Sequence, residues 1–300
     1  MPSPALQPIV DTHQHLWDLD RFSLPWTKNE KSLAHNFVMS DYFKATEGLN
    51  IAQTVYMEVD LEPRQQEAEA RYVIDLCERD DNPMTAAVIS GRPSHEGFGE
   101  YLDKFKNNPQ VKGLRQVLHV ASTPQGYCLD PKFVRGVQLL GDRGLSYDLC
   151  MRSGELLDAD KLVAQCPRTR FIVDHCGNMS VTEKDDEKRK AWKLGMQHLA
   201  DHDNVVCKVS GIVASAAEKW TAADLKPNIE FTLETFGPDR VMFGGDWPVC
   251  TLRATYRAWV AALEEIIKDR SVEERQKLFH DNAVKFYGLP PKGKKWQKPK

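Results

Sequence analysis

Residues 9–17 read Ile-Val-Asp-Thr-His-Gln-His-Leu-Trp, an apolar run in which two histidines stand two residues apart. In a β-strand, successive side chains point to opposite faces, so His13 and His15 are expected on the same face. Two imidazoles placed in this way can bind one metal ion, with nitrogen–zinc distances of about 2.0–2.1 Å. The same alternation puts Asp11 on that face, one layer deeper. On its own the pattern is weak evidence, because buried histidines are also common as hydrogen-bonded core residues.

Apolar, β-branched runs like the first recur along the chain, and segments with helical spacing of their apolar residues lie between them. The strand-like runs are residues 9–15, 51–60, 84–91, 111–119, 145–151, 170–177, 204–211 and 240–248, and clear helical patterns cover 63–79, 188–202 and 253–269. This alternation predicts βα units and a parallel sheet. Eight units predict a single-domain α/β protein, a closed (β/α)₈ TIM barrel over residues 1–289. No G-x-G-x-x-G follows the first strand, which argues against a dinucleotide-binding sheet.

Composition excludes several classes of partner. The net charge is −3 and the pI is about 6.3, so neither nucleic acid nor an anionic membrane is expected as a partner. No apolar run approaches the roughly 18 residues that span a bilayer, and the first residues do not read as a signal peptide. Seven scattered cysteines without a CxxC motif predict a reduced, cytoplasmic protein without disulfides. Residues 290–300, with five lysines, are predicted to form a basic, disordered tail.

The long connection 16–39 is rich in aromatic residues. It contains Trp17, Phe22, Trp26 and Phe37. Connections of this length are often lids or binding loops, so we expect it over the mouth of the barrel. The alternative is a loop that folds on the surface for packing alone, and for Trp26 the two interpretations weigh equally.

Catalytic residues of such barrels lie at the carboxyl ends of the strands. The polar residues predicted there are His13, His15, Glu58, Asp60, Arg115, Gln116, His119, Asp148, Arg152, Asp174, His175 and Asp246. Asp246 is the most informative, because it follows an apolar run and two glycines. An ionised carboxylate in such surroundings costs several kcal/mol unless it is paired or bound to a metal. The alternative role for Asp246 is the N-cap of the next helix.

Four other strand-end residues carry specific expectations. His175 precedes a glycine turn and is expected in the site, whereas Asp174 has the opposite parity and is expected to face the helices as a structural anchor. Glu58 is expected either to bind substrate or to form a surface ion pair. Arg115 is expected to bind a carboxylate or a developing oxyanion in bidentate fashion, or else to close a salt bridge at the barrel mouth.

These motifs together resemble the amidohydrolase superfamily and, within it, the L-fuconolactonase-like sugar lactonases. The resemblance runs from about residue 9 to residue 289. It is carried by Asp-Thr-His-Gln-His-Leu-Trp at 11–17, Pro-Trp at 25–26, Gly-Leu-Arg-Gln at 113–116, Asp-His-Cys-Gly at 174–177 and Phe-Gly-Gly-Asp-Trp-Pro-Val at 243–249.

The resemblance implies a (β/α)₈ barrel in which an activated water attacks the substrate. Asp246 would be the general base, with His175 and Arg115 as its catalytic partners. The metal ligands would be His13, His15, His175 and Asp246, and the substrate-binding residues would be Trp26, Glu58, Gln116 and His119.

The chain departs from the superfamily pattern at two strands. Many members carry a lysine or glutamate on strand four that bridges two metals, and a histidine on strand five. Here strand four ends Leu-Arg-Gln-Val and strand five reads Tyr-Asp-Leu-Cys. A binuclear site is therefore not expected. One divalent ion, zinc first, is the expected cofactor, and catalysis without metal stays open.

Three functions are compatible with these residues to different degrees. The first is hydrolysis of a sugar-acid lactone, similar to L-fucono- or L-rhamnonolactone, by Asp-activated water. The second is a metal-dependent decarboxylase or other lyase on the same barrel. The third, a barrel without catalysis, is disfavoured because the polar strand-end residues share one face. The expected partner is a small-molecule lactone, and homo-oligomerisation is left open.

Overall fold

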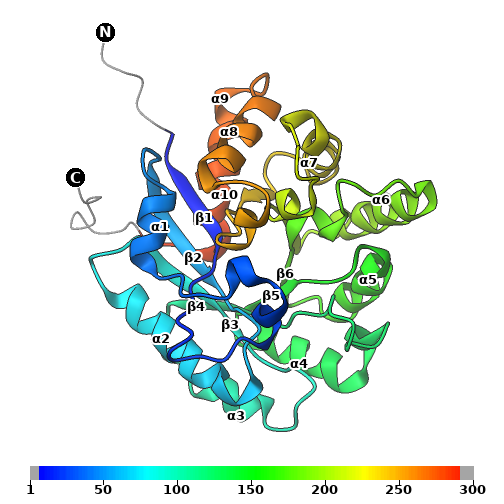
Figure 1. Cartoon of the computed structure of the whole chain (residues 1–300). Coiled ribbons are helices and arrows are strands. Elements are labelled where there is room, and N and C mark those ends of the chain that lie inside the picture. Colours follow the sequence, from blue (N-terminus) through cyan, green and yellow to red (C-terminus); the bar gives the residue numbers. More distant parts are fainter. Residues whose placement is uncertain (1–6, 291–300) are drawn as a thin grey trace.

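Eight parallel strands form a barrel with helices around it in the computed structural model, which describes residues 7–290 (Figure 1). The strands are β1 (Ile9–Gln14), β2 (Ile51–Met57), β3 (Met84–Ser90), β4 (Val111–Arg115), β5 (Ser146–Leu149), β6 (Arg170–Val173), β7 (Val205–Val209) and β8 (Val241–Phe243). They pair in sequence order. β8 meets β1 where the backbone N–H of Asp246 donates to the carbonyl oxygen of His13 at 2.8 Å. The predicted single-domain (β/α)₈ barrel is confirmed.

The helices cover the outside of the barrel. They are α1 (Met39–Ala45), α2 (Gln66–Glu78), α3 (Phe98–Asp103), α4 (Pro131–Asp142), α5 (Leu156–Gln165), α6 (Asp186–Ala200), α7 (Ala222–Phe236), α8 (Tyr256–Ile266), α9 (Val272–Gln276) and α10 (Asn282–Tyr287). α4 shows how the sequence specifies them. The side chain of Asp130 accepts from the backbone N–H of Lys132, proline fills the first helical position, and the inward face buries Phe133 and Val137.

The side chains inside the barrel change from apolar to polar along the barrel axis. The amino end of the barrel is filled by an apolar cluster that includes Val10, Val55 and Val88, and α10 packs against this cluster. Further along the strands the buried residues become polar, beginning with Asp148 and Lys208. The barrel therefore has a dry, closed end and a polar end, and the polar end holds the candidate site.

A β-bulge in β1 corrects the expected position of Asp11. Asp11 pairs with Thr54 and Gln14 pairs with Tyr56, so β1 uses one more residue than β2 between these two pairs. The extra residue reverses the side-chain alternation, because alternation has a period of two. The expectation that Asp11 shares the face of the two histidines is therefore wrong.

Asp11 instead ties the barrel wall to two helices. Its Oδ2 accepts from the hydroxyl of Tyr42 on α1 at 2.8 Å and from that of Tyr256 on α8 at 2.9 Å. Its Oδ1 accepts from the backbone N–H of Gly245 at 2.7 Å. A side chain on Gly245 would not fit, since a Cβ there would lie 2.3 Å from the ring of Tyr256. Asp11 thus fixes the chain just before Asp246.

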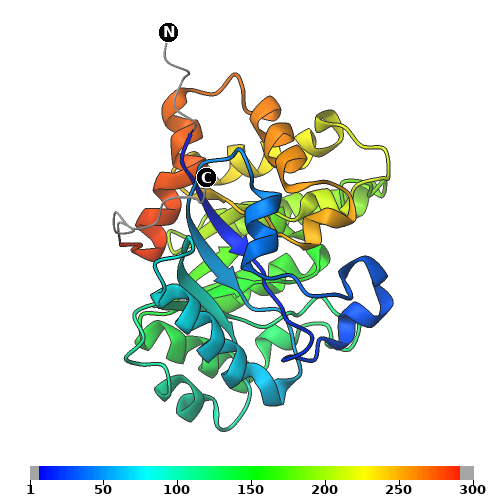
Figure 2. The same ribbon diagram turned by 60° about the vertical axis from the view of Figure 1, so that its left-hand side comes forward.

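The aromatic connection between β1 and α1 is ordered by its own contacts. The backbones of Trp17 and Phe37 exchange two hydrogen bonds of 2.9 Å, and the indole N–H of Trp26 donates to the carbonyl oxygen of Val59 at 2.8 Å. In Figure 2 this dark-blue segment projects beyond the arrowheads of β1 and β2. The segment therefore lies at the polar end of the barrel.

Two further sequence expectations concern the chain ends and membranes. The predicted basic tail falls, apart from its first residue, outside the described residues. Between residues 7 and 290, no helix is long and apolar enough to cross a membrane.

Candidate active site

A cavity of about 420 Å³ opens where the strands end. Its lining comes from the ends of several strands and from the aromatic connection: His15, Trp26, Val59, Asp60, Arg115, Val117, His119, Val120, Cys150, His175, Asn178, Gly211, Ala214, Ser215, Asp246 and Val249. Of the predicted site residues, six line the cavity, and His13 lies directly beneath it. Glu58 and Gln116 are buried and are not among the described residues that line the cavity.

Backbone strain is concentrated around this cavity. Five described residues other than glycine have positive φ, and four of them line the cavity: Asp60, His175, Asn178 and Asp246. Such conformations cost of order 1–3 kcal/mol each and persist where the surrounding structure imposes them. Their gathering at one cavity is typical of a functional site.

His13, His15 and Asp246 form the floor of the cavity. The Nε2 atoms of His13 and His15 lie 3.7 Å and 3.3 Å from Oδ1 of Asp246. Two ligands of a tetrahedral zinc ion lie about 3.3–3.4 Å apart, given zinc–ligand distances of about 2.0–2.1 Å. The hydrogen bond between Nδ1 of His15 and the carbonyl oxygen of Met57, at 2.9 Å, leaves Nε2 of His15 as a lone-pair donor. The three residues therefore fit a divalent metal ion.

The formal charges beneath the cavity also suit a divalent cation. Glu58, Asp148, Asp174 and Asp246 are buried carboxylates, and the buried cations Arg115 and Lys208 contact the first three of them. Four negative and two positive charges leave a formal excess of two negative charges. Buried charges are stable when they are paired, so this excess favours a bound cation.

Arg115 is held by protein groups on every side. Its Nε and Nη2 donate to Oε1 and to the backbone oxygen of Glu58, each at 2.7 Å. Its Nη1 lies 3.3 Å from Oδ2 of Asp174 and 3.2 Å from Nε2 of His13. An imidazole nitrogen has one lone pair, so Nε2 of His13 either accepts from Arg115 or binds a metal. Arg115 is thus a fixed cation under the cavity. Its guanidinium N–H groups already contact protein groups, so few remain to bind a substrate.

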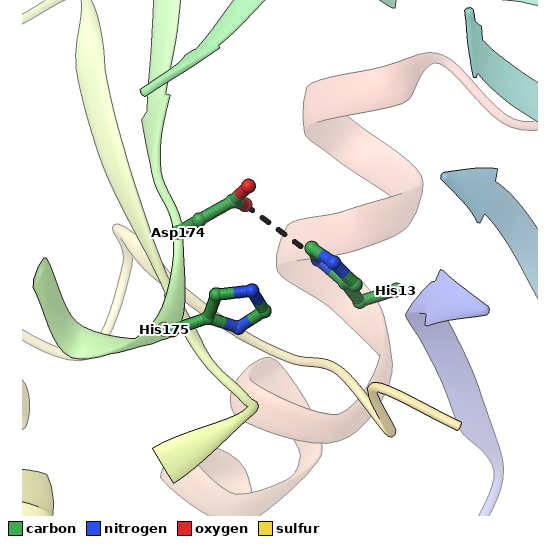
Figure 3. A group of neighbouring side chains, drawn as sticks. All are labelled: His13, Asp174 and His175. Carbon is green, nitrogen blue, oxygen red and sulfur yellow. Dashed lines mark ion pairs between the residues drawn. The ribbon is translucent and has the colours of Figure 1, made fainter. Parts of the chain in front are cut away.

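Asp174 points into the barrel, which corrects the expectation that it would face the helices. Its Oδ1 lies 3.6 Å from Nδ1 of His13 (Figure 3). The same oxygen lies 3.4 Å from Nζ of Lys208. β6 ends at Val173, and the next residues turn with φ near 53° at His175, so strand alternation no longer applies. Asp174 and His175 therefore both contribute to the site.

Lys208 was missed by the sequence analysis. It lies fully buried on β7, and its Nζ contacts Oδ2 of Asp148 at 2.5 Å. Burial lowers the pKa of Lys208, but the Asp148 and Asp174 carboxylates outweigh this and raise it. The sequence did contain a signal for Lys208, namely a lysine inside the apolar run Val-Val-Cys-Lys-Val. Burying its charge costs as much as burying that of Asp246, so a paired charge could have been predicted there.

His175 is held at the cavity edge by the two residues that follow β7. Its Nδ1 lies 2.9 Å from the hydroxyl oxygen of Ser210, which leaves Nε2 as the ring nitrogen for other partners. Gly211 makes room for the ring, since a Cβ there would lie 2.2 Å from Nδ1 of His175. Burial lowers the pKa of both His13 and His175, although nearby carboxylates partly oppose this. Both rings are therefore neutral at pH 7, as metal binding or proton acceptance requires.

His119 and Trp26 lie at the rim. Nδ1 of His119 is 3.3 Å from the sulfur of Cys150, and the ring is exposed. Trp26 is half-buried and packs edge-on against Trp17, with ring centroids 5.5 Å apart. Both side chains therefore lie where a bound molecule would enter.

Three kinds of comparison, with family models, with curated proteins and with solved structures, find proteins similar to this chain. The family model described as amidohydrolase matches residues 10–289. An L-fucono-1,5-lactonase of Burkholderia multivorans is 28% identical over 94% of this chain and 96% of its own. An L-rhamnono-gamma-lactonase of Scheffersomyces stipitis is 27% identical over 64% of this chain and 65% of its own. A crystal structure of an amidohydrolase from Burkholderia multivorans with bound zinc superposes with a TM-score of 0.83 at 26% identity, covering 95% of this chain and all of the other.

Proposed function

The chain belongs to the amidohydrolase family, and we propose that it opens the ester ring of a sugar-acid lactone with a water molecule that Asp246 activates. The observation that carries this proposal is the placement of the Asp246 carboxylate. It lies on the cavity floor between two imidazoles and is held there in a strained backbone conformation. Relatives named as lactonases support the choice of substrate.

Asp246 and His175 would carry the proton transfers. The Asp246 carboxylate accepts a proton from water as the water oxygen bonds to the lactone carbonyl carbon. His175, through Nε2, hydrogen-bonds the carbonyl oxygen as it becomes an oxyanion, and the fixed charge of Arg115 below stabilises the same negative charge. The bond from the carbonyl carbon to the ring oxygen then breaks. The proton returns from Asp246 to that oxygen, which becomes a hydroxyl group.

His13, His15 and Asp246 would hold a divalent ion. Such an ion, when bound, polarises a carbonyl group and lowers the pKa of water. His175, the fourth predicted ligand, belongs to a different group of ligand atoms, in which it lies within 4.8 Å of His13 and Asp174. Its Nε2 is therefore assigned to the substrate carbonyl oxygen and not to the ion. Zinc is the first candidate, because two imidazoles and a carboxylate are ligands that it accepts.

The pairing of Arg115 argues against the alternative function, a metal-dependent decarboxylase. Such an enzyme needs a cation that binds the substrate carboxylate, and Arg115 was the candidate. The guanidinium of Arg115 is already paired with Glu58 and Asp174, so a substrate carboxylate would have to displace a buried partner. Breaking a buried ion pair of this kind is strongly unfavourable. Hydrolysis of an uncharged lactone requires no such exchange.

The direct test is acid release from a panel of sugar-acid lactones with five- and six-membered rings, followed with a pH indicator. We expect turnover well above spontaneous ring opening on at least one member. Each lactone is run with and without a strong chelator. A rate lost with chelator assigns carbonyl polarisation to an ion on the floor residues, whereas an unchanged rate assigns it to Arg115 and the histidines. No turnover on any lactone would contradict the proposal.

Trp26→Ala is expected to raise the KM of the best lactone about tenfold and to leave kcat within about threefold, because the indole covers the rim without touching the floor groups. Steady-state kinetics measure both constants. Trp220→Ala changes a tryptophan that is half-buried like Trp26 but lies outside the cavity lining; it is the matched control and should leave both constants unchanged. A fall in kcat with unchanged KM would contradict the rim role of Trp26.

A further inference from the structure

We propose that Asp60 restricts this cavity to uncharged lactones: its carboxylate accepts hydrogen bonds from substrate hydroxyl groups and repels lactones that carry a carboxylate. This inference rests on the proposed lactonase function and names its substrate class more narrowly. It also assigns a role to the aspartate that follows β2, which the proton transfers and the floor residues do not use.

The position of Asp60 is fixed by its neighbours. Its backbone N–H donates to Oε2 of Glu58 at 2.8 Å, and its φ of 47° turns the chain sharply after β2. Its Oδ1 pairs with Nη2 of Arg92 at 3.2 Å. The side chain is 28% exposed and lines the cavity. Among the contacts between described residues, Oδ2 of Asp60 has no partner, so one oxygen remains as an acceptor for a bound molecule.

The cations near the cavity are already neutralised. Arg115 is paired with Glu58 and Asp174, and Arg92 is paired with Asp60 itself. Arg115 is also the single arginine or lysine among the described residues that line the cavity. Among the described residues, a substrate carboxylate would thus find no unpaired arginine or lysine side chain at the cavity.

An anionic substrate would instead meet the carboxylate of Asp60, whose charge does not depend on whether the floor residues hold a cation. Asp60 lines the cavity whereas its partner Arg92 does not, and like charges brought close in a partly dry site repel each other strongly. The remaining wall is largely apolar, with Val59, Val117 and Val249 among its members. An uncharged ring suits this lining, with hydroxyl groups toward Asp60 and carbon atoms against the valines.

The test compares two lactones of the same ring size and configuration. One is the neutral lactone that the wild-type protein hydrolyses fastest, and the other carries a carboxylate in place of its terminal methyl or hydroxymethyl group. Rates are measured at pH 7.5, where Asp60 is ionised, since burial and the adjacent Glu58 raise its pKa only to about 6. We expect wild-type kcat/KM to favour the neutral lactone by about 100-fold.

Variants of the ion pair should move this preference in opposite directions. Asp60→Asn should reduce it about tenfold, through a lower KM for the anionic lactone and a higher KM for the neutral one. Arg92→Gln removes the cation behind Asp60 and should increase the preference. Glu62→Gln is the matched control, because Glu62 pairs with Arg64 and is absent from the cavity lining. It should leave the preference unchanged.

Three outcomes would overturn the inference. An unchanged preference in Asp60→Asn, with the neutral lactone still hydrolysed, contradicts the role of Asp60 and leaves the proposed lactonase function standing. A preference that falls in Arg92→Gln contradicts it as well, and this arm does not depend on the folding of Asp60→Asn. A wild-type protein that hydrolyses no lactone overturns the lactonase function and the inference together.

Discussion

Asp246→Asn is expected to lower kcat on the best lactone by about 10²–10⁴-fold, the range that general-base catalysis contributes. The amide has the shape of the carboxylate but cannot accept a proton from water. The backbone hydrogen bond between Asp246 and His13 does not involve the side chain, so the barrel closure should persist. Steady-state rates, together with a thermal unfolding curve that matches the wild-type curve, measure the effect.

Asp130→Asn is the matched control for this variant. Asp130 caps α4 and does not line the cavity, and asparagine is an equally good helix cap. Its activity and stability should equal those of the wild-type protein. An Asp246→Asn protein with activity within about tenfold of wild type would contradict the general-base role.

Lys208→Met is expected to lower the free energy of unfolding by about 3–5 kcal/mol, because removing one member of a buried ion pair leaves its partners uncompensated. Asp148 and Asp174 both depend on Lys208, and all three side chains are fully buried. Urea denaturation of both proteins at pH 8 measures the change, since Asp148 of the wild-type protein, whose pKa burial raises to about 7, is then ionised and paired with Lys208.

Lys161→Met provides the comparison. Lys161 pairs with Asp158 on the surface, where an ion pair contributes about 0–1 kcal/mol. We expect a correspondingly small change in its free energy of unfolding. A Lys208→Met protein as stable as the Lys161→Met protein would contradict the idea that the buried network stabilises the barrel.

The barrel could be predicted because its signal repeats. Each strand is a short apolar run followed by a helical pattern, and misplacing one run by a few residues does not change the topology. The strands do end earlier than predicted: β2 ends at Met57 and β6 at Val173. Turns with positive φ follow them, and a periodic pattern cannot locate such turns.

The same limitation explains the two wrong orientations. The prediction that His13 and His15 lie together is correct, since both reach Asp246, although His13 lies within the irregular part of β1 and His15 directly follows the strand. Strand alternation failed for Asp11, which precedes the bulge, and for Asp174, which lies past the end of β6. A single extra residue reverses every side chain on one side of it.

The sequence could not predict which buried charged residues would pair with one another. Glu58 and Arg115 are 57 residues apart, and nothing local indicates that each would hold the other. Lys208 differs, because its place in an apolar strand was visible. Its partners, however, come from β5 and the end of β6 and follow from the three-dimensional arrangement alone.

The central claim is that this cavity adds water to a lactone, and product mass in oxygen-18 water tests it most directly. The wild-type protein is incubated with the best lactone, and the product is analysed by mass spectrometry beside a sample without protein. We predict a product heavier than the lactone by one water, with a single oxygen-18 atom in its new carboxylate, formed much faster than in the control. Release of carbon dioxide from a related carboxylated substrate, with no lactone opened above the spontaneous rate, would contradict the account.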